Sequence, residues 1–188
     1  RATQGQYPPG STFKVIMAIA ALEEGAVNPE SSIQDPGFFP FGNRNFRDWK
    51  KGGHGAVNLH KAIVVSCDTY FYQLGAKLGV DRIAKWARAF GLGEKTGVAL
   101  DDEKSRIIPD TEWKRKRFRQ PWFPGETISV AIGQGYVTVT PLQLANMMAA
   151  VGNGGKLFRP YLVRRVESLD GAAVREYGPH LIRTIAMK

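Results

Sequence analysis

The chain has 188 residues, of which 43% are hydrophobic, and its formal net charge is +9 at pH 7. This length and composition predict one domain with a sizeable core and exclude an intrinsically disordered chain. The excess of positive charge favours anionic partners, such as nucleic acid, anionic lipid or an acidic polymer, without choosing among them.

The pattern of apolar residues predicts a mainly helical chain with a small β part. Residues 11–24 are predicted as a buried helix, because apolar side chains surround its axis, and Gly25 is its predicted stop. Residues 26–57 are rich in glycine and proline, which predicts a long ordered loop. A second helical region covers residues 58–78 and is interrupted near the letters SCDT.

Capping residues predict three further helices. Asp81 is a good N-cap for a helix that ends before Gly91, and Asp110 is a good N-cap for the segment TEWKRKRF. Thr140 and Pro141 open the helix PLQLANMMAAV, which the glycines of GNGG close.

Two segments predict β structure. GLGEKTGVAL is a glycine-rich turn that leads into a short strand, and residues from about 160 to 177 form a hairpin around Asp170 and Gly171. The basic segment 114–119 is predicted to be a solvated face, with contact to an anionic partner as the alternative.

Ser11 and Lys14 are the first pair of residues that suggest chemistry. Three residues apart on a helix, they project from neighbouring points on one face, and the helix N-terminus favours negative charge that develops on Ser11. A lysine among apolar side chains loses hydration, which favours the neutral amine that a general base requires. The pair therefore fits a nucleophile and its base, the alternative being a capping serine followed by an ordinary lysine.

Ser66 and Asp68 supply a second hydroxyl and a carboxylate. The hydroxyl can relay a proton to a leaving amine, and the acidic side chain can orient it. The alternative is that both residues only cap the helix that follows.

At these residues the chain resembles a known family. YPPGSTFK, SCDTYFYQLG, FGLGEKTGVAL, ISVAIGQGYVTVTPLQLA and GNGGKLFRPYLV follow, in order and spacing, the transpeptidase domain of class B penicillin-binding proteins. RDWKKGGHG, EWKRKRFRQPWF and the aspartate at position 68 are typical of the cell-elongation branch, the penicillin-binding protein 2 group. The resemblance implies the helical portion of the penicillin-recognising serine transpeptidase fold, which is of the α/β type shared with β-lactamases.

The same resemblance implies a peptidoglycan DD-transpeptidase that cross-links stem peptides during cell-wall elongation. Ser11 would form the acyl-enzyme with Lys14 as its base, Ser66 would relay the proton, and Asp68 would replace the usual asparagine. β-Lactam antibiotics would acylate Ser11. The segment Gln134, Gly135 and Tyr136 would lie near the cleft and bind substrate.

The resemblance further implies that residues 1–188 are an incomplete transpeptidase domain, truncated at both ends. The copy of K-T-G at residues 95–97 precedes the GQGY segment, whereas the family's catalytic copy follows it, so we expect the K-T-G strand to be absent. Since one oxyanion-hole donor is worth about 10²–10³ in rate, the chain alone is expected to be weakly active or inactive.

Cys67 is the single cysteine, which excludes an internal disulfide. With Asp35, Asp48 and His54 it would complete a closed, structural zinc site that tethers the 26–57 loop. The alternative is a buried thiol, an exposed imidazole and two aspartates in turns. The resemblance supports zinc, because some members of this branch carry it on such ligands.

The expected setting also comes from the resemblance. The whole protein would lie at the periplasmic face of the bacterial inner membrane on a single-pass anchor, with a membrane glycan polymerase and other elongation proteins as partners, and without nucleic acid. The alternatives are a related DD-carboxypeptidase or β-lactamase, a basic binding module without catalysis, and a penicillin-binding scaffold that has lost activity.

Overall fold

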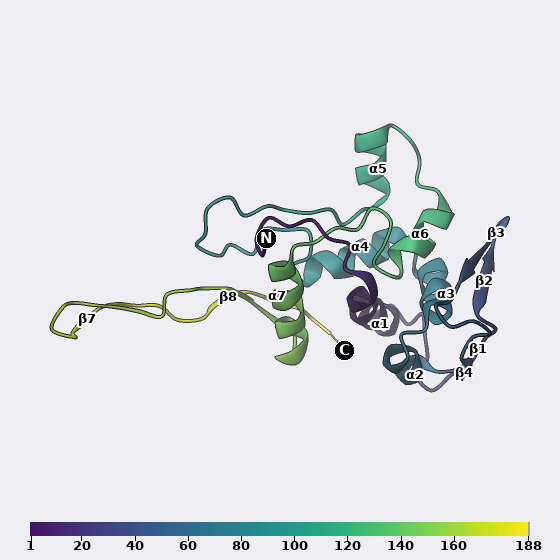
Figure 1. The fold of residues 1–188 in the computed structure, drawn as a ribbon, viewed down its shortest axis with the longest axis horizontal. Helices are drawn as coiled ribbons and strands as arrows, with labels where there is room; N and C mark the ends of the chain where they lie inside the picture. The colour runs from purple at the N-terminus through teal and green to yellow at the C-terminus, as the bar shows by residue number, and fades with distance from the viewer. Residues whose placement is uncertain (188) are drawn as a thin grey trace.

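A buried helix that follows Pro9 forms the centre of the computed structural model, which describes residues 1–187 (Figure 1). In chain order the helices are the 3-10 helix η1 (Gly10–Phe13), α1 (Lys14–Glu23), α2 (Leu59–Val64), α3 (Asp68–Leu78), α4 (Val80–Ala89), α5 (Thr111–Phe118), α6 (Pro124–Val130) and α7 (Pro141–Gly152). The prediction of a mainly helical chain with a small β part is confirmed. None of the helices in this part of the chain is long and apolar enough to cross a bilayer.

The central helix α1 packs against α3 and α4, and its side chains Ile16, Met17 and Ala20 are completely buried. The segment predicted as one helix over residues 11–24 starts with the tighter turns of η1, and Ser11 lies in these turns. A hydrogen bond from the Gly10 N–H to the Gly133 carbonyl joins the start of η1 to the segment after α6. Short 3-10 turns are common where a helix begins.

Within residues 1–187 the strands pair in four antiparallel two-stranded sheets. The pairs are β1 (Ile33–Asp35) with β4 (Gly55–Val57), β2 (Phe38–Phe41) with β3 (Arg44–Arg47), β5 (Lys156–Arg159) with β8 (His180–Thr184), and β6 (Arg165–Glu167) with β7 (Ala173–Glu176).

The first two pairs lie inside residues 26–57, where the sequence predicts a loop. Phe39 pairs with Phe46 across β2 and β3, and both rings lie within 6.5 Å of the Tyr72 ring on α3. Side-chain pairs across two strands stabilise short sheets. The local sequence pattern does not reveal that Tyr72 of α3 packs against this pair. The prediction of a loop without strands is therefore corrected.

Two of the three predicted helix N-caps are confirmed, and the third is wrong. The Asp110 carboxylate accepts the Trp113 N–H at 2.6 Å, and Thr140 accepts the Gln143 N–H at 3.1 Å, which confirms both predicted N-caps. Asp81 lies one residue inside α4 instead, where its carboxylate accepts the N–H and hydroxyl of Thr111 at the start of α5. Asp81 thus joins two helices.

The GLGEKTGVAL segment has no strand in the part of the chain that the structure describes, contrary to prediction. The carboxylate of Glu103 closes this turn by accepting the N–H groups of Thr96 and Gly97 and the hydroxyl of Thr96. These bonds satisfy the backbone groups that a strand would otherwise pair.

The chain after α7 forms an arm. β6 and β7 pair around Asp170 and Gly171, where a hairpin is predicted, and Figure 1 shows this hairpin projecting from the helical body. The pair β5 and β8 connects the arm to α7. Neither this pair nor α6 is predicted by the sequence.

Lys114 differs from the prediction for the basic segment 114–119. Its side chain is 2% exposed and forms an ion pair with Glu126, and Nζ lies 4.4 Å from the ring centroid of Phe123. The prediction of a solvated face is wrong for this residue, because α5 turns it towards the start of α6. The other residues of the segment are exposed.

Candidate active site

Two segments far apart in the chain, around residues 11–14 and 66–68, bring two serines, a lysine and an aspartate together. Lys14 Nζ lies 2.9 Å from Ser66 Oγ and 2.5 Å from Asp68 Oδ1. Ser66 Oγ in turn lies 2.9 Å from Ser11 Oγ. The Ser66 hydroxyl therefore bridges Ser11 and Lys14, and the arrangement can carry a proton from one serine through the other to the amine.

The Lys14 side chain is buried away from solvent. The residue is 2% exposed although it is the first residue of α1. Besides its two side-chain partners, Nζ donates to the backbone carbonyl of Ser66 at 2.9 Å. Three acceptors match the three N–H donors of an ammonium group, so the buried amine is fully hydrogen-bonded and does not point into bulk solvent.

Ser66 owes its position to the way in which α2 ends. The Cys67 N–H bonds to the Ala62 carbonyl and the Ser66 N–H to the Ile63 carbonyl, which is the double hydrogen bond of a Schellman C-cap. Ser66 occupies the left-handed position of this motif with a φ of 53°. Glycine is the usual residue there, and a side chain costs about 1–2 kcal/mol. The strained residue is the one whose hydroxyl bridges the site.

Ser11 is exposed on η1, and the segment 133–136 fixes the backbone beside it. The buried Gly133 accepts the Gly10 N–H at 3.0 Å. Gln134 and Gly135 follow and are exposed. The half-buried Tyr136 turns its ring to Trp113, with ring centroids 5.1 Å apart, so its side chain belongs to an aromatic cluster beside α5.

Replacing Gly133 by alanine is expected to destabilise the protein by about 2 kcal/mol or more. Gly133 has a φ of 69°, which costs an alanine about 1–2 kcal/mol. The added Cβ would also lie 2.3 Å from the Gly10 carbonyl oxygen, which must then move. Urea unfolding of the variant measures the loss.

Gly154→Ala is the matched control, because Gly154 has a φ of 77° and nothing within 4 Å of the added Cβ. We expect it to lose only the cost of the left-handed backbone. Equal losses in both variants would show that the close approach of Gly133 to Gly10 has no energetic consequence.

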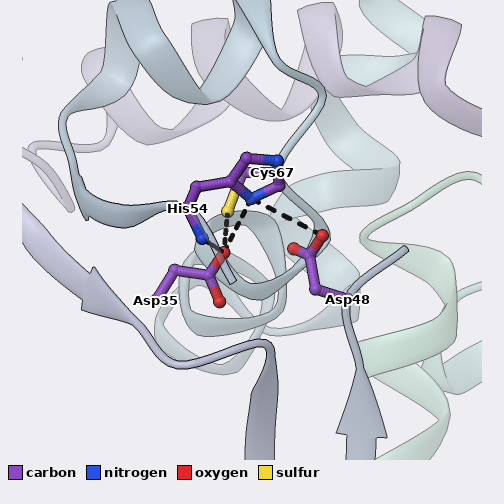
Figure 2. A group of neighbouring side chains, drawn as sticks. All are labelled: Asp35, Asp48, His54 and Cys67. Atoms are coloured by element: carbon purple, nitrogen blue, oxygen red, sulfur yellow. Dashed lines mark hydrogen bonds and ion pairs between the residues drawn. The ribbon is translucent and has the colours of Figure 1, made fainter. Parts of the chain in front are cut away.

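A second cluster includes Cys67, the residue after Ser66, and contains the four predicted metal ligands (Figure 2). Asp35 ends β1, Asp48 follows β3, His54 precedes β4, and Cys67 is the N-cap of α3. Their ligand atoms all lie within 4.8 Å of one another. His54 Nδ1 is 2.8 Å from Asp35 Oδ2 and 3.6 Å from Asp48 Oδ1, and Cys67 Sγ is 3.3 Å from Asp35 Oδ2.

The charges in this cluster are unusual for a protein interior. Burial raises the pKa of Asp35, but hydrogen bonds from the Gly37 N–H, His54 and Cys67 outweigh it and leave the pKa at about 2. Burial, with the carboxylates of Asp35 and Asp48 nearby, raises the pKa of the Cys67 thiol. The Asp35 carboxylate is thus ionised beside a Cys67 thiol that resists ionisation. A bound cation would stabilise negative charge on both groups.

Trp49 lies between the two clusters and is not predicted as a site residue. Its indole N–H lies 3.1 Å from the carbonyl oxygens of both Val65 and Ser66, and its ring meets His54 edge-on at 5.3 Å. The available sequence signal was its place directly after Asp48, inside the segment RDWKKGGHG.

Comparison with protein families matches residues 1–185 to the penicillin binding protein transpeptidase domain. The chain belongs to this family. The resemblance that the sequence motifs predict is therefore confirmed.

Curated relatives of this transpeptidase domain include two proteins named peptidoglycan D,D-transpeptidase MrdA. The Haemophilus influenzae protein is 47% identical over 184 residues, which cover 97% of this chain and 28% of the relative. The Acinetobacter baumannii protein is 49% identical over 177 residues, which cover 93% of this chain and 26% of the relative. The chain thus spans about a quarter of the length of these relatives.

Solved structures show the same fold. Pseudomonas aeruginosa PBP2 in complex with WCK 5153 is 41% identical with a TM-score of 0.88, and the match covers 100% of this chain and 42% of that one. Penicillin-binding protein A from M. tuberculosis, solved as an imipenem acyl-enzyme complex, is 30% identical with a TM-score of 0.79, covering 99% of this chain and 41% of that one.

Proposed function

We propose that the whole protein is a peptidoglycan D,D-transpeptidase and that this chain carries its acyl-enzyme centre. The observation that carries the proposal is the continuous hydrogen-bonded path from Ser11 through Ser66 to the buried Lys14. The names of the curated relatives and the acyl-enzyme of the M. tuberculosis protein support the same reaction class.

In the first half of the proposed reaction Ser11 Oγ attacks the carbonyl carbon between the two D-alanines of a stem peptide. The Oγ–C bond forms, the C–N bond breaks, and the terminal D-alanine leaves. The hydroxyl proton of Ser11 passes to Ser66 Oγ, whose own proton passes to Lys14 Nζ. A proton then returns along the same path to the nitrogen of the leaving D-alanine. The product of this step is a neutral ester between Ser11 and the stem peptide.

In the second half the amine of a neighbouring stem peptide attacks the ester carbonyl. The new amide bond forms, the ester C–O bond breaks, and Ser11 takes back a proton that the attacking amine loses. The product is a cross-link between two stem peptides. A β-lactam would enter the first half and stop there, because its ring amide opens without releasing a leaving group.

Asp68 has a defined part in this scheme. An ammonium at Lys14 uses all three of its N–H groups, so the amine must lose one proton before it can accept another from Ser66. The Asp68 carboxylate, at 2.5 Å from Nζ, is the acceptor in contact. The proposed role of Asp68 is to hold the lysine in place and to share its proton.

Mass spectrometry of the full-length protein after treatment with penicillin tests the proposed function. We expect one penicilloyl adduct per molecule, mapped to the peptide that contains Ser11, and slow loss of that adduct over hours. Rapid turnover of penicillin would identify a β-lactamase, and an unmodified protein would refute the acyl-enzyme centre.

We also propose that the whole protein works at the periplasmic face of the inner membrane in a cell-elongation complex with a membrane glycan polymerase. Two related structures support this setting. One is a complex between PBP2 and MreC from Helicobacter pylori, at 39% identity, and the other is a peptidoglycan synthase complex that coordinates polymerization and crosslinking, at 40% identity. Protease access to the full-length protein in intact spheroplasts tests the location.

We propose further that Asp35, Asp48, His54 and Cys67 hold a structural Zn²⁺. One thiolate, one imidazole and two carboxylates are ligands that zinc accepts in closed tetrahedral sites. The four donors are already gathered within 4.8 Å, and backbone N–H groups hold both carboxylates in place. When bound, the ion would neutralise the buried negative charge and tether β1, β3 and β4 to the start of α3.

Removal of this zinc is expected to lower the melting temperature of the protein by about 8–16 °C. A ligand present at about 1,000 times its Kd stabilises by about 4 kcal/mol, and each kcal/mol shifts Tm by about 2–4 °C in a domain of this size. Differential scanning calorimetry before and after a zinc chelator measures the change.

Cys67→Ala supplies the matched control. It removes the softest ligand without adding bulk, so the variant should melt at the temperature of the chelated protein and should not respond to chelator. Elemental analysis that finds no zinc in protein purified without chelator would remove the proposal.

A further inference from the structure

The Ser66 backbone is in a conformation that serine does not favour, with a φ of 53°. Its carbonyl accepts a hydrogen bond from Lys14 Nζ at 2.9 Å, so one of its two flanking peptide groups is held from inside the protein. A second donor acts from the outer side, and it is the indole of Trp49.

The Trp49 N–H bridges the carbonyl oxygens of Val65 and Ser66, at 3.1 Å from each. These carbonyls belong to the two peptide groups on either side of the Ser66 Cα. A single donor that holds both peptide planes restrains the φ and the ψ of Ser66 together. These carbonyls also lie at the end of α2, where helix geometry leaves acceptors without partners.

Burial does not explain the presence of a tryptophan at this position. Trp49 is 64% exposed, the largest exposed fraction among the tryptophans of the described residues. Its one hydrogen-bond donor nevertheless points inward to the backbone. The Asp48 carboxylate accepts the N–H groups of Lys50 and Thr69, at 3.0 and 2.9 Å, and this anchors the turn that carries the indole to the start of α3.

We propose that Trp49 is a positioning residue that holds Ser66 in its left-handed conformation, so that the Ser66 hydroxyl bridges Ser11 and Lys14. This inference rests on the proposed function, because it concerns the rate at which Ser11 is acylated. It assigns to the indole N–H an effect on proton transfer through Ser66, and none on the affinity for the acylating ligand.

The test is the acylation of the full-length protein by a fluorescent penicillin, with the first-order acylation constant k2 and the dissociation constant Kd measured separately. Trp49→Phe keeps an aromatic ring and removes the N–H. We expect k2 to fall by about 3- to 10-fold, the effect of one hydrogen bond, while Kd changes by less than about twofold. Trp122→Phe is the matched control, because it removes an indole N–H that donates to Thr127 Oγ1 at 2.8 Å, outside this site.

A double-mutant cycle separates positioning from a general loss of stability. In the Ser66→Ala background the relay hydroxyl is absent, so adding Trp49→Phe should change k2 by less than about twofold. The inference is overturned if Trp49→Phe acylates like the wild type, if the loss appears in Kd, or if the loss is as large in the Ser66→Ala background. Failure of the wild type itself to be acylated at Ser11 would refute the proposed function instead.

Discussion

Replacing Ser11 by alanine is expected to abolish the covalent adduct of the full-length protein with penicillin. Ser11 Oγ is the exposed end of the proton path, 2.9 Å from Ser66 Oγ. Ser66 is itself half-buried, and its hydroxyl contacts the amine, so it is not placed to replace the missing nucleophile. Intact-mass spectrometry with saturating penicillin measures the adduct, which should fall below the detection limit.

The control for this result is Ser31→Ala. Ser31 is an exposed serine whose hydroxyl donates only to the Asn28 carbonyl, and its loss should leave one adduct per molecule. An adduct of unchanged stoichiometry on the Ser11→Ala protein would place the nucleophile elsewhere and would refute the assignment of this site.

Replacing Lys14 by methionine is expected to slow acylation by about 10²–10⁴-fold, the usual contribution of a positioned general base. Methionine is unbranched and fits the apolar surroundings of α1, so the change removes the amine with little change in packing. The rate of labelling by fluorescent penicillin measures the loss. Lys85→Met is the control, because Lys85 also forms an ion pair, with Glu24 at 2.9 Å, but its side chain is 66% exposed.

A fall in rate could also follow from loss of structure, because Asp68 is left without its partner. Breaking a buried ion pair costs about 3–5 kcal/mol, whereas removing both partners is often neutral. The double variant Lys14→Met with Asp68→Asn should therefore recover stability and remain slow. Recovery of the acylation rate together with stability would show that Lys14 acts only as a structural partner of Asp68.

The sequence predicted local features well wherever the signal spans one helical turn. The N-caps Asp110 and Thr140 and the interruption near SCDT are features of this kind, since a capping side chain bonds to a backbone N–H only two or three residues ahead. The same reasoning misplaced Asp81, because a carboxylate near a helix start can also serve a different helix.

Features that depend on a distant partner were missed. Lys114 lies in a basic segment for which the sequence predicts a solvated face. Its ammonium group instead pairs with Glu126 and lies over the ring of Phe123. Trp49 carries no local signal for its hydrogen bonds, because its acceptors are 16 and 17 residues away in the chain. The strands within residues 26–57 likewise depend on Tyr72 of α3.

By itself the sequence determined which chemical groups are available and where the helices capped by Asp110 and Thr140 begin. Ser11, Lys14, Ser66 and Asp68, and the four candidate metal ligands, could all be named from their residue types and from the family pattern. Only the tertiary structure decided that Ser66, 55 residues from Ser11, lies between that serine and the amine of Lys14. The physical reason is that a hydrogen bond across such a separation forms only when the burial of α1 against α3 brings the two segments together, and that packing is a property of the whole core.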